Sequence, residues 1–232
     1  MKVFIFSISV LFLVLSVSTV WGGKESRVNP NLVPMFGGAE KNAIQVAADE
    51  SFIQDVVKAV GSRDKGSEEF VKKGWAAFFD KHDPATAMMR FNQAWLLNPE
   101  NSDVLWGFGV VSGAMNNIDS SVKFLRQAAE KLTNNARVQA DLGFSLTLFA
   151  NQSDDAKVAE EIIAEAFACF AKAEKLESDY EPLFSNWAIA LFLNKDYAGA
   201  WDKIIKAEKL GGKTLNPRFI KDLETKMPRP AN

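Results

Sequence analysis

Apolar and polar positions alternate with a helical period through most of this chain. Between about Asn42 and Val60 the apolar residues recur every three or four positions, which places them on one face of a helix: Phe52, Ile53, Val56, Val57 and Val60. Gly61 follows directly and supplies a helix stop. We therefore expect an amphipathic helix here, followed by a long region with the same kind of pattern.

The first twenty residues differ, because they form an almost unbroken apolar run from Val3 to Val20 with Lys2 as the only preceding charge. A basic start, an apolar stretch and a serine-rich end are typical of a secretory signal peptide. The run is also just long enough to span a bilayer, so an uncleaved membrane anchor is the alternative. We predict a signal peptide at residues 1–22 and an exported protein, periplasmic or secreted, that contacts a membrane only through this leader if it is uncleaved.

The next stretch, residues 24–41, is rich in Gly, Pro and Asn and is expected to resist regular structure. It contains one apolar patch, Leu32–Phe36. We therefore divide the rest of the chain into an N-terminal irregular segment and helix, 23–61, and a repeat region, 62–232.

The repeat region has a period near 34 residues. Gly74, Gly109 and Gly143 lie 35 and 34 residues apart, each early in an apolar stretch with helical spacing. The first copy is marked by Phe70, Gly74, Ala87, Phe91, Ala94 and Pro99, with one extra residue in the turn at Lys81–Asp83. Two further copies are marked by Leu105, Phe108, Gly109, Ser121, Leu125, Ala128 and Thr133, and by Phe184, Trp187, Ala188, Ala200, Ile204 and Ala207. The remaining copy has Leu142, Gly143, Ala166, Phe170 and Ala173, with about eleven extra residues between its halves.

This pattern resembles the tetratricopeptide repeat (TPR) family over roughly Gly66–Gly212. The resemblance implies an all-α fold, a TPR-like solenoid of about four helix-turn-helix repeats. Small residues at Gly74, Gly109, Gly143 and Ala188 are expected to let each first helix approach its partner closely, opposite Ala87, Ser121, Ala166 and Ala200. A C-terminal capping helix is expected from Pro217 to about Lys226.

Composition and charge exclude several functions. A formal charge of -2 over 232 residues does not suit a nucleic-acid binder, which needs a basic surface. The single histidine, His82, lies in a polar turn, and the single cysteine, Cys169, lies among apolar residues of a helix. No group of residues forms a catalytic, metal or cofactor site, so we predict that the protein is not an enzyme and needs no cofactor or metal.

The resemblance also implies a concave groove lined by the first helix of each repeat. The corresponding positions are almost all apolar or aromatic: Val71, Trp75, Phe78, Phe79, Trp106, Val110, Phe144, Leu148, Ile189, Phe192 and Leu193. The Lys and Asn residues with which some TPR domains hold a C-terminal carboxylate are absent from them. So large an apolar surface needs a cover, either residues 32–36 and 42–60 of the chain itself or an apolar segment of a partner.

The extra residues of the third repeat predict one long helix from about Asp154 to Leu176. Its first turns would form an acidic prong, marked by Asp155, Glu160, Glu161 and Glu165. Two interpretations stay open, a solvated extension and a docking element for a basic partner.

These features together indicate an exported scaffold or adaptor for a protein or peptide partner, by analogy in the bacterial cell envelope. A carrier or chaperone that holds an apolar ligand or peptide in the groove is the alternative.

Overall fold

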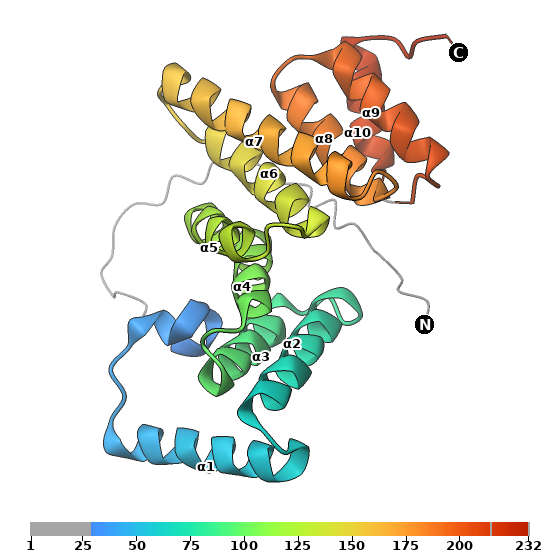
Figure 1. Ribbon diagram of the computed structural model, residues 1–232. Helices are drawn as coiled ribbons and strands as arrows, with labels where there is room; N and C mark the ends of the chain where they lie inside the picture. The colour runs from blue at the N-terminus through green and yellow to red at the C-terminus, as the bar shows by residue number, and fades with distance from the viewer. Residues whose placement is uncertain (1–28, 214, 232) are drawn as a thin grey trace. The chain divides into compact units, whose positions relative to one another are not determined.

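The computed structural model describes residues 29–213 and 215–231, and all regular structure in these residues is helical (Figure 1). Two short 3-10 helices come first, η1 (Pro30–Leu32) and η2 (Pro34–Gly38). Ten α-helices follow: α1 (Ala43–Val60), α2 (Arg63–Phe79), α3 (Pro84–Leu97), α4 (Ser102–Ala114), α5 (Ile118–Lys131), α6 (Ala136–Ala150), α7 (Ala156–Leu176), α8 (Glu181–Leu193), α9 (Tyr197–Lys209) and α10 (Pro217–Lys226). The predicted signal peptide, 1–22, lies outside the described residues. None of the described helices combines the length and apolarity that a bilayer crossing requires.

Helices next to each other in sequence pack as pairs: α2 with α3, α4 with α5, α6 with α7, and α8 with α9. Helix α10 packs on α9 at the C-terminal end. The expected all-α architecture of four helix pairs, an N-terminal helix and a C-terminal capping helix is confirmed.

The described chain falls into two compact units. The N-terminal unit comprises residues 29–101, from η1 to α3, and the C-terminal unit comprises residues 102–231, from α4 to α10.

Three of the helix pairs share one turn construction. A residue in the left-handed conformation stands directly before the Asp or Asn that caps the second helix: His82 before Asp83, Asn116 before Asn117, and Lys195 before Asp196. In the later two turns the N–H of the capping residue donates to the carbonyl five positions earlier, from Asn117 to Ser112 and from Asp196 to Leu191. In the first turn Asp83 reaches back six positions to Ala77, which accommodates the extra residue seen in the sequence.

The repeat glycines lie where the paired helices come closest, but two of them face other residues than expected. A Cβ atom at Gly109 would lie 2.5 Å from Cγ and 3.0 Å from the backbone nitrogen of Leu125, rather than against Ser121. A Cβ atom at Gly74 would lie 2.8 Å from Cζ of Phe91, one helical turn beyond Ala87. Only Gly143 meets its expected partner, since its added Cβ would lie 3.0 Å from the carbonyl oxygen of Ala166. In the α2–α3 and α4–α5 pairs the closest contact of the glycine thus lies one turn beyond the residue that the repeat alignment pairs with it.

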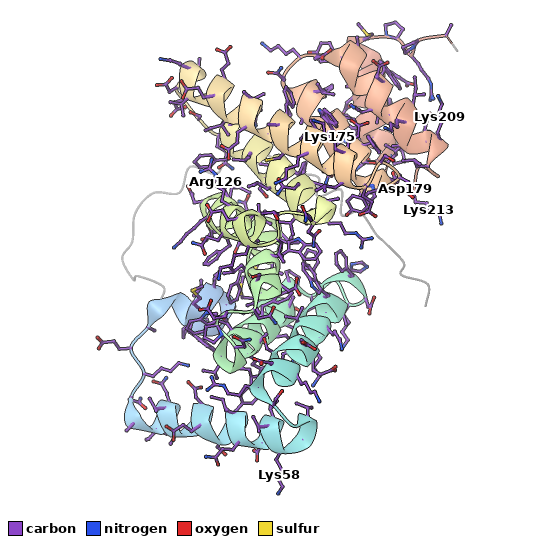
Figure 2. All side chains as sticks on the ribbon, in the orientation of Figure 1. Lys58, Arg126, Lys175, Asp179, Lys209 and Lys213 are labelled. Atoms are coloured by element: carbon purple, nitrogen blue, oxygen red, sulfur yellow. The ribbon has the colours of Figure 1, made fainter. Side chains whose placement is uncertain are left out.

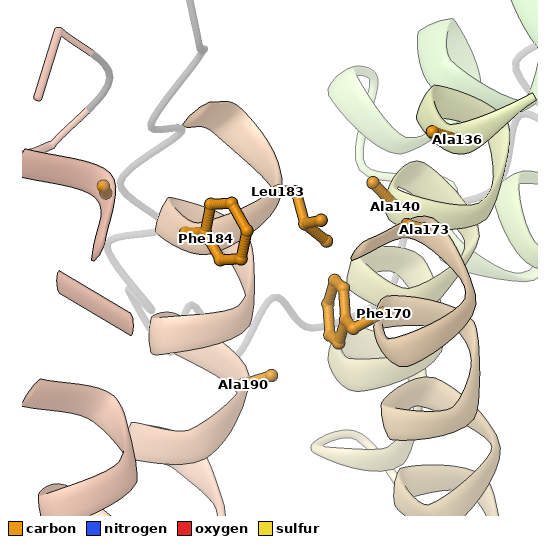
Figure 3. Close-up of a cluster of buried hydrophobic side chains, with 8 residues drawn as sticks. Ala136, Ala140, Phe170, Ala173, Leu183, Phe184 and Ala190 are labelled. Carbon is orange, nitrogen blue, oxygen red and sulfur yellow. The ribbon is translucent and has the colours of Figure 1, made fainter. Parts of the chain in front are cut away.

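The core between the last two pairs explains the pattern of aromatic and small residues. Phe170 of α7 and Leu183 and Phe184 of α8 fill the space between the pairs and are fully buried (Figure 3). Two alanines on α6, Ala136 and Ala140, leave room for these side chains. Helix α10 closes the last pair, with Leu223 fully buried in the cluster that contains Trp201.

The long helix expected in the third repeat is present. Helix α7 has 21 residues against 15 in its partner α6. Its N-cap is Asp155, whose side chain accepts hydrogen bonds from the backbone N–H groups of Lys157 and Val158. The expected range, 154–176, is confirmed to within two residues at the start.

Candidate functional site

The C-terminal unit contains a hydrogen-bonded pair that joins neighbouring first helices. Trp106 of α4 donates its indole Nε1–H to Oδ2 of Asp141 on α6, at 2.7 Å. Both side chains are half-buried. Trp106 donates its hydrogen bond to Oδ2 of Asp141. The other carboxylate oxygen, Oδ1, can accept a hydrogen bond from a ligand.

The surroundings of Asp141 change its acidity. Burial raises the pKa of this carboxyl to about 6, although the indole hydrogen bond and the charge of Arg137 both lower it. A carboxylate in a poorly solvated place favours any neighbour that donates a hydrogen bond or a positive charge. Asp141 is thus the described residue with the strongest chemical reason to bind a partner group on this face.

Two more residues complete the polar cluster around Asp141. Arg137 lies one turn earlier on α6, and its guanidinium group lies 3.5 Å from Glu177 and over the ring of Tyr180, at 5.1 Å from the ring centre. Burial, and then the charge of Asp141, raise the pKa of the Tyr180 hydroxyl. We call Trp106, Arg137, Asp141 and Tyr180 the Asp141 cluster.

Apolar side chains adjoin this cluster on α4 and α6. Val110 and Leu148 are half-buried and pack, like Trp106, against the same buried cluster, and Phe144 is half-buried one turn after Asp141. We call Trp106, Val110, Asp141, Phe144 and Leu148 the inner face. Four of its members were predicted as groove residues, and the structure places all four partly open to solvent on adjacent helices.

The predicted groove residues of α8 differ in their surroundings. Ile189 is half-buried. Phe192 packs its ring against Phe219 of α10 and against Tyr197, with centroids 5.4 and 5.6 Å away. Phe192 therefore serves mainly to attach the C-terminal cap, because its aromatic contacts are already internal.

In the N-terminal unit the predicted groove residues pack mostly against one another. Val71 and Phe78 are buried and so do not form an open surface. Trp75 stacks on Phe79 with ring centroids 5.5 Å apart and meets Phe91 edge-on at 5.1 Å. These four residues satisfy much of their own apolar surface within the α2–α3 pair.

One interpretation of the sequence placed the apolar patch at residues 32–36 in the groove formed by the first helices. The patch lies on α3, the second helix of the pair, where it is bound by Asn92 and Trp95. Helix α1 packs instead near the start of α2, with Phe52 edge-on to Phe70 at 5.3 Å. Residues 32–36 therefore pack on the second helix of the pair, and α1 packs near the start of the first helix.

The predicted acidic prong is smaller than expected. Glu165 accepts two hydrogen bonds from Arg126 of α5, at 2.6 and 3.1 Å, and so belongs to a contact between helices. Arg126 is labelled in Figure 2. Asp155 is the N-cap of α7. Glu160 and Glu161 are exposed. Asp155, Glu160 and Glu161 are thus all exposed, and a docking role for these three residues stays a prediction.

His82 and Cys169, the single histidine and the single cysteine of the chain, have structural roles. His82 is an exposed residue in the left-handed position of its turn. Cys169 is buried, and burial together with Glu165 raises its thiol pKa to about 11, as befits a small core residue. Within residues 29–213 and 215–231, His, Cys, Asp and Glu nowhere gather into a group that could hold a metal ion.

An open hollow of about 590 Å³ lies near the turn between α5 and α6. Its lining is polar and apolar in nearly equal parts and comprises residues 131–136, Leu176 and Glu177. Glu177 of this lining lies 3.5 Å from Arg137, so the hollow adjoins the Asp141 cluster.

Sequence reasoning missed Arg137 and Asp141, although a signal was present. Both share a helix face with the predicted groove residues Phe144 and Leu148, at spacings of four, three and four residues. Neither residue is a Lys or Asn, the residue types with which some TPR domains hold a carboxylate, so the groove pattern did not mark them.

Comparison with solved structures agrees with this architecture. A thermophilic TPR protein of Thermus thermophilus superposes with a TM-score of 0.62 at 14% identity, over 70% of this chain and 84% of that protein. The chain has the TPR fold. PilF of Pseudomonas aeruginosa superposes with a TM-score of 0.54 at 19% identity, over 71% of this chain and 70% of that protein. No family model and no curated protein matches this TPR chain by sequence.

Proposed function

We propose that this protein is a non-enzymatic interaction scaffold that binds a segment of a partner protein on the inner face of its C-terminal unit. The observation behind this proposal is the Trp106–Asp141 pair, set in an apolar surface formed by adjacent first helices. Half-buried aromatic and aliphatic side chains gain free energy when a partner covers them, roughly 25 cal/mol per Å² of apolar area.

Asp141 adds specificity to this apolar surface. A partner segment that brings a backbone N–H or a basic side chain to its free oxygen would stabilise the carboxylate that burial disfavours. Arg137, which lies between Glu177 and Tyr180, restricts where such a group can enter. The partner segment is therefore apolar with one donor or basic group, in the mode in which a peptide or helix lies in a groove.

A photo-cross-linking experiment in the source cells tests this proposal. A benzophenone amino acid replaces Phe144 on the inner face, and in a matched control it replaces Lys172, an exposed residue of α7. We expect a discrete protein adduct from position 144 that is absent from position 172. Adducts of equal pattern at both positions, or none at position 144, would refute an inner-face scaffold.

Export is a second part of the proposal and rests on the leader-like pattern of residues 1–22. The intact mass of the protein recovered from fractionated cells tests it. A mature mass that lacks about the first 22 residues, in the envelope or secreted fraction, is the expected result. A full-length mass in the cytoplasmic fraction would contradict export and leave the inner-face proposal untouched.

A further inference from the structure

Residues 31–36 lie on α3 in the way that a bound peptide does. The side chain of Asn92 is fully buried and makes three hydrogen bonds, all to backbone atoms of this segment. Its Nδ2 donates to the carbonyl oxygens of Asn31 at 3.1 Å and Val33 at 2.9 Å, and its Oδ1 accepts from the N–H of Phe36 at 3.3 Å. The Asn92 amide thus donates both Nδ2 hydrogens to the backbone of residues 31–36 and accepts one hydrogen bond from it through Oδ1.

The side-chain contacts of the segment are also those of a docked peptide. Phe36 meets Trp95 of α3 edge-on, with ring centroids 6.3 Å apart, and the ammonium group of Lys41 lies over its ring. Neither η1 nor η2 contains a buried residue. The segment therefore lies on the surface of the N-terminal unit and is held by α3 rather than enclosed in a core.

The backbone of the docked segment is strained. Met35 and Phe36 have φ values of 53° and 55°, in the left-handed region that side chains with a Cβ atom disfavour. Gly37 and Gly38 continue the same left-handed turn, both with φ of 68°. This strain is relieved when the segment leaves α3, which weakens its hold relative to an unstrained peptide in another chain.

We propose that the surface around Asn92 and Trp95, the Asn92 face, is a second peptide-binding site, which residues 31–36 occupy in cis. In trans, the site binds an apolar segment of a partner protein that resembles residues 31–36. This segment offers two carbonyl groups two residues apart and a backbone N–H three residues after the second carbonyl. It also offers an aromatic ring that packs on Trp95. Either peptide can form the same three hydrogen bonds to the Asn92 amide, so displacement is an exchange of one peptide for another. This site lies in the N-terminal unit and does not depend on the inner face.

The test uses the full chain with its own segment released. In the double variant Gly37→Val and Gly38→Val, two branched side chains occupy left-handed positions, and the first Cβ would also lie 3.0 Å from Cγ2 of Val33. Helix α3 stays unchanged. The probe is a fluorescent peptide with the native sequence of residues 29–38, and its binding is followed by fluorescence anisotropy.

We expect the released variant to bind the probe at least about tenfold more tightly than the parent chain, because its own segment no longer competes. Adding Asn92→Ala should abolish binding, whereas adding Gln93→Ala, at the next position of α3, should preserve it. Equal binding by the parent and released chains, no binding by the released chain, or binding that survives Asn92→Ala would each overturn the proposal.

A measurement on the parent chain covers the case in which the released variant does not fold. Excess unlabelled peptide should speed hydrogen exchange at the backbone N–H of Phe36, since displacement breaks its bond to Asn92. An exchange rate at Phe36 that stays the same as peptide concentration rises would show that the segment is a fixed brace, and the proposal would fall.

Discussion

Replacing Asp141 by Asn should make the protein more stable at neutral pH than its parent. An Asn side chain has nearly the same shape, and its Oδ1 can accept the same hydrogen bond from the indole of Trp106. The substitution therefore removes little except the charge. Because burial raises the pKa of Asp141, the folded protein holds this charge at a cost that the variant avoids.

The size and sign follow from the pKa. The carboxyl titrates near 3.8 when unfolded and near 6 when folded, which corresponds to about 3 kcal/mol at 1.36 kcal/mol per pKa unit. Below about pH 4 both states are protonated, so the charge contributes nothing. Between about pH 4 and 6 the folded state keeps the proton that the unfolded state has lost, and rising pH therefore destabilises the parent. Above about pH 6 the penalty is complete.

Urea unfolding of parent and variant from pH 4 to 7.5 measures this effect. The free energy of unfolding of Asp141→Asn minus that of the parent should rise by up to about 3 kcal/mol over this range. In melting temperature the rise corresponds to about 6–12 °C, at roughly 2–4 °C per kcal/mol for a chain of this size. Asp179→Asn, which removes an exposed carboxylate in the turn before α8, is the matched control for the loss of one negative charge. A difference between Asp141→Asn and parent that stays constant with pH would refute the reasoning.

Three further predictions concern packing and reactivity. Gly109→Ala should lower the free energy of unfolding by about 1–2 kcal/mol, and Gly113→Ala should lower it by less. The reason is that the new Cβ atom meets a backbone nitrogen at position 109 but a hydroxyl group at position 113. Equal losses of the two variants in urea unfolding would show that the helices do not cross tightly at Gly109. A double-mutant cycle on Arg126→Ala and Glu165→Ala should give a coupling free energy of at most about 1 kcal/mol, and this energy should fall as salt is added. The reason is that both side chains are more than two-fifths exposed. A larger coupling free energy that does not change with salt would contradict a solvent-screened ion pair. Cys169 should react with an aromatic disulfide at pH 8 at least about 100-fold more slowly in the folded chain than in urea, since burial raises its thiol pKa; similar rates would contradict a buried thiol.

The structure differs from the sequence-based expectations mainly at contacts between distant residues. Asn92 binds residues about sixty positions away, and Trp106 bonds Asp141 across 35 positions. Nothing in the local pattern of α3 marks Asn92 as a clamp, because an Asn in a helix is ordinarily a solvated residue. Glu165 likewise resembles a solvated acid in the sequence, until α5 brings Arg126 beside it.

The sequence by itself determined the helices and their pairing. Helix starts depend on nearby capping residues such as Asn42 and Asp155, and the repeat period depends on small residues that recur in phase; both are local properties of the chain. Only the tertiary structure decided which side chains the helices bring together. The offset at which two helices cross places Gly109 against Leu125 rather than Ser121, and the position of residues 31–36 is set by one amide on α3. Such choices depend on the shape of the packed surfaces, because many offsets satisfy the same periodic pattern and only close packing distinguishes them.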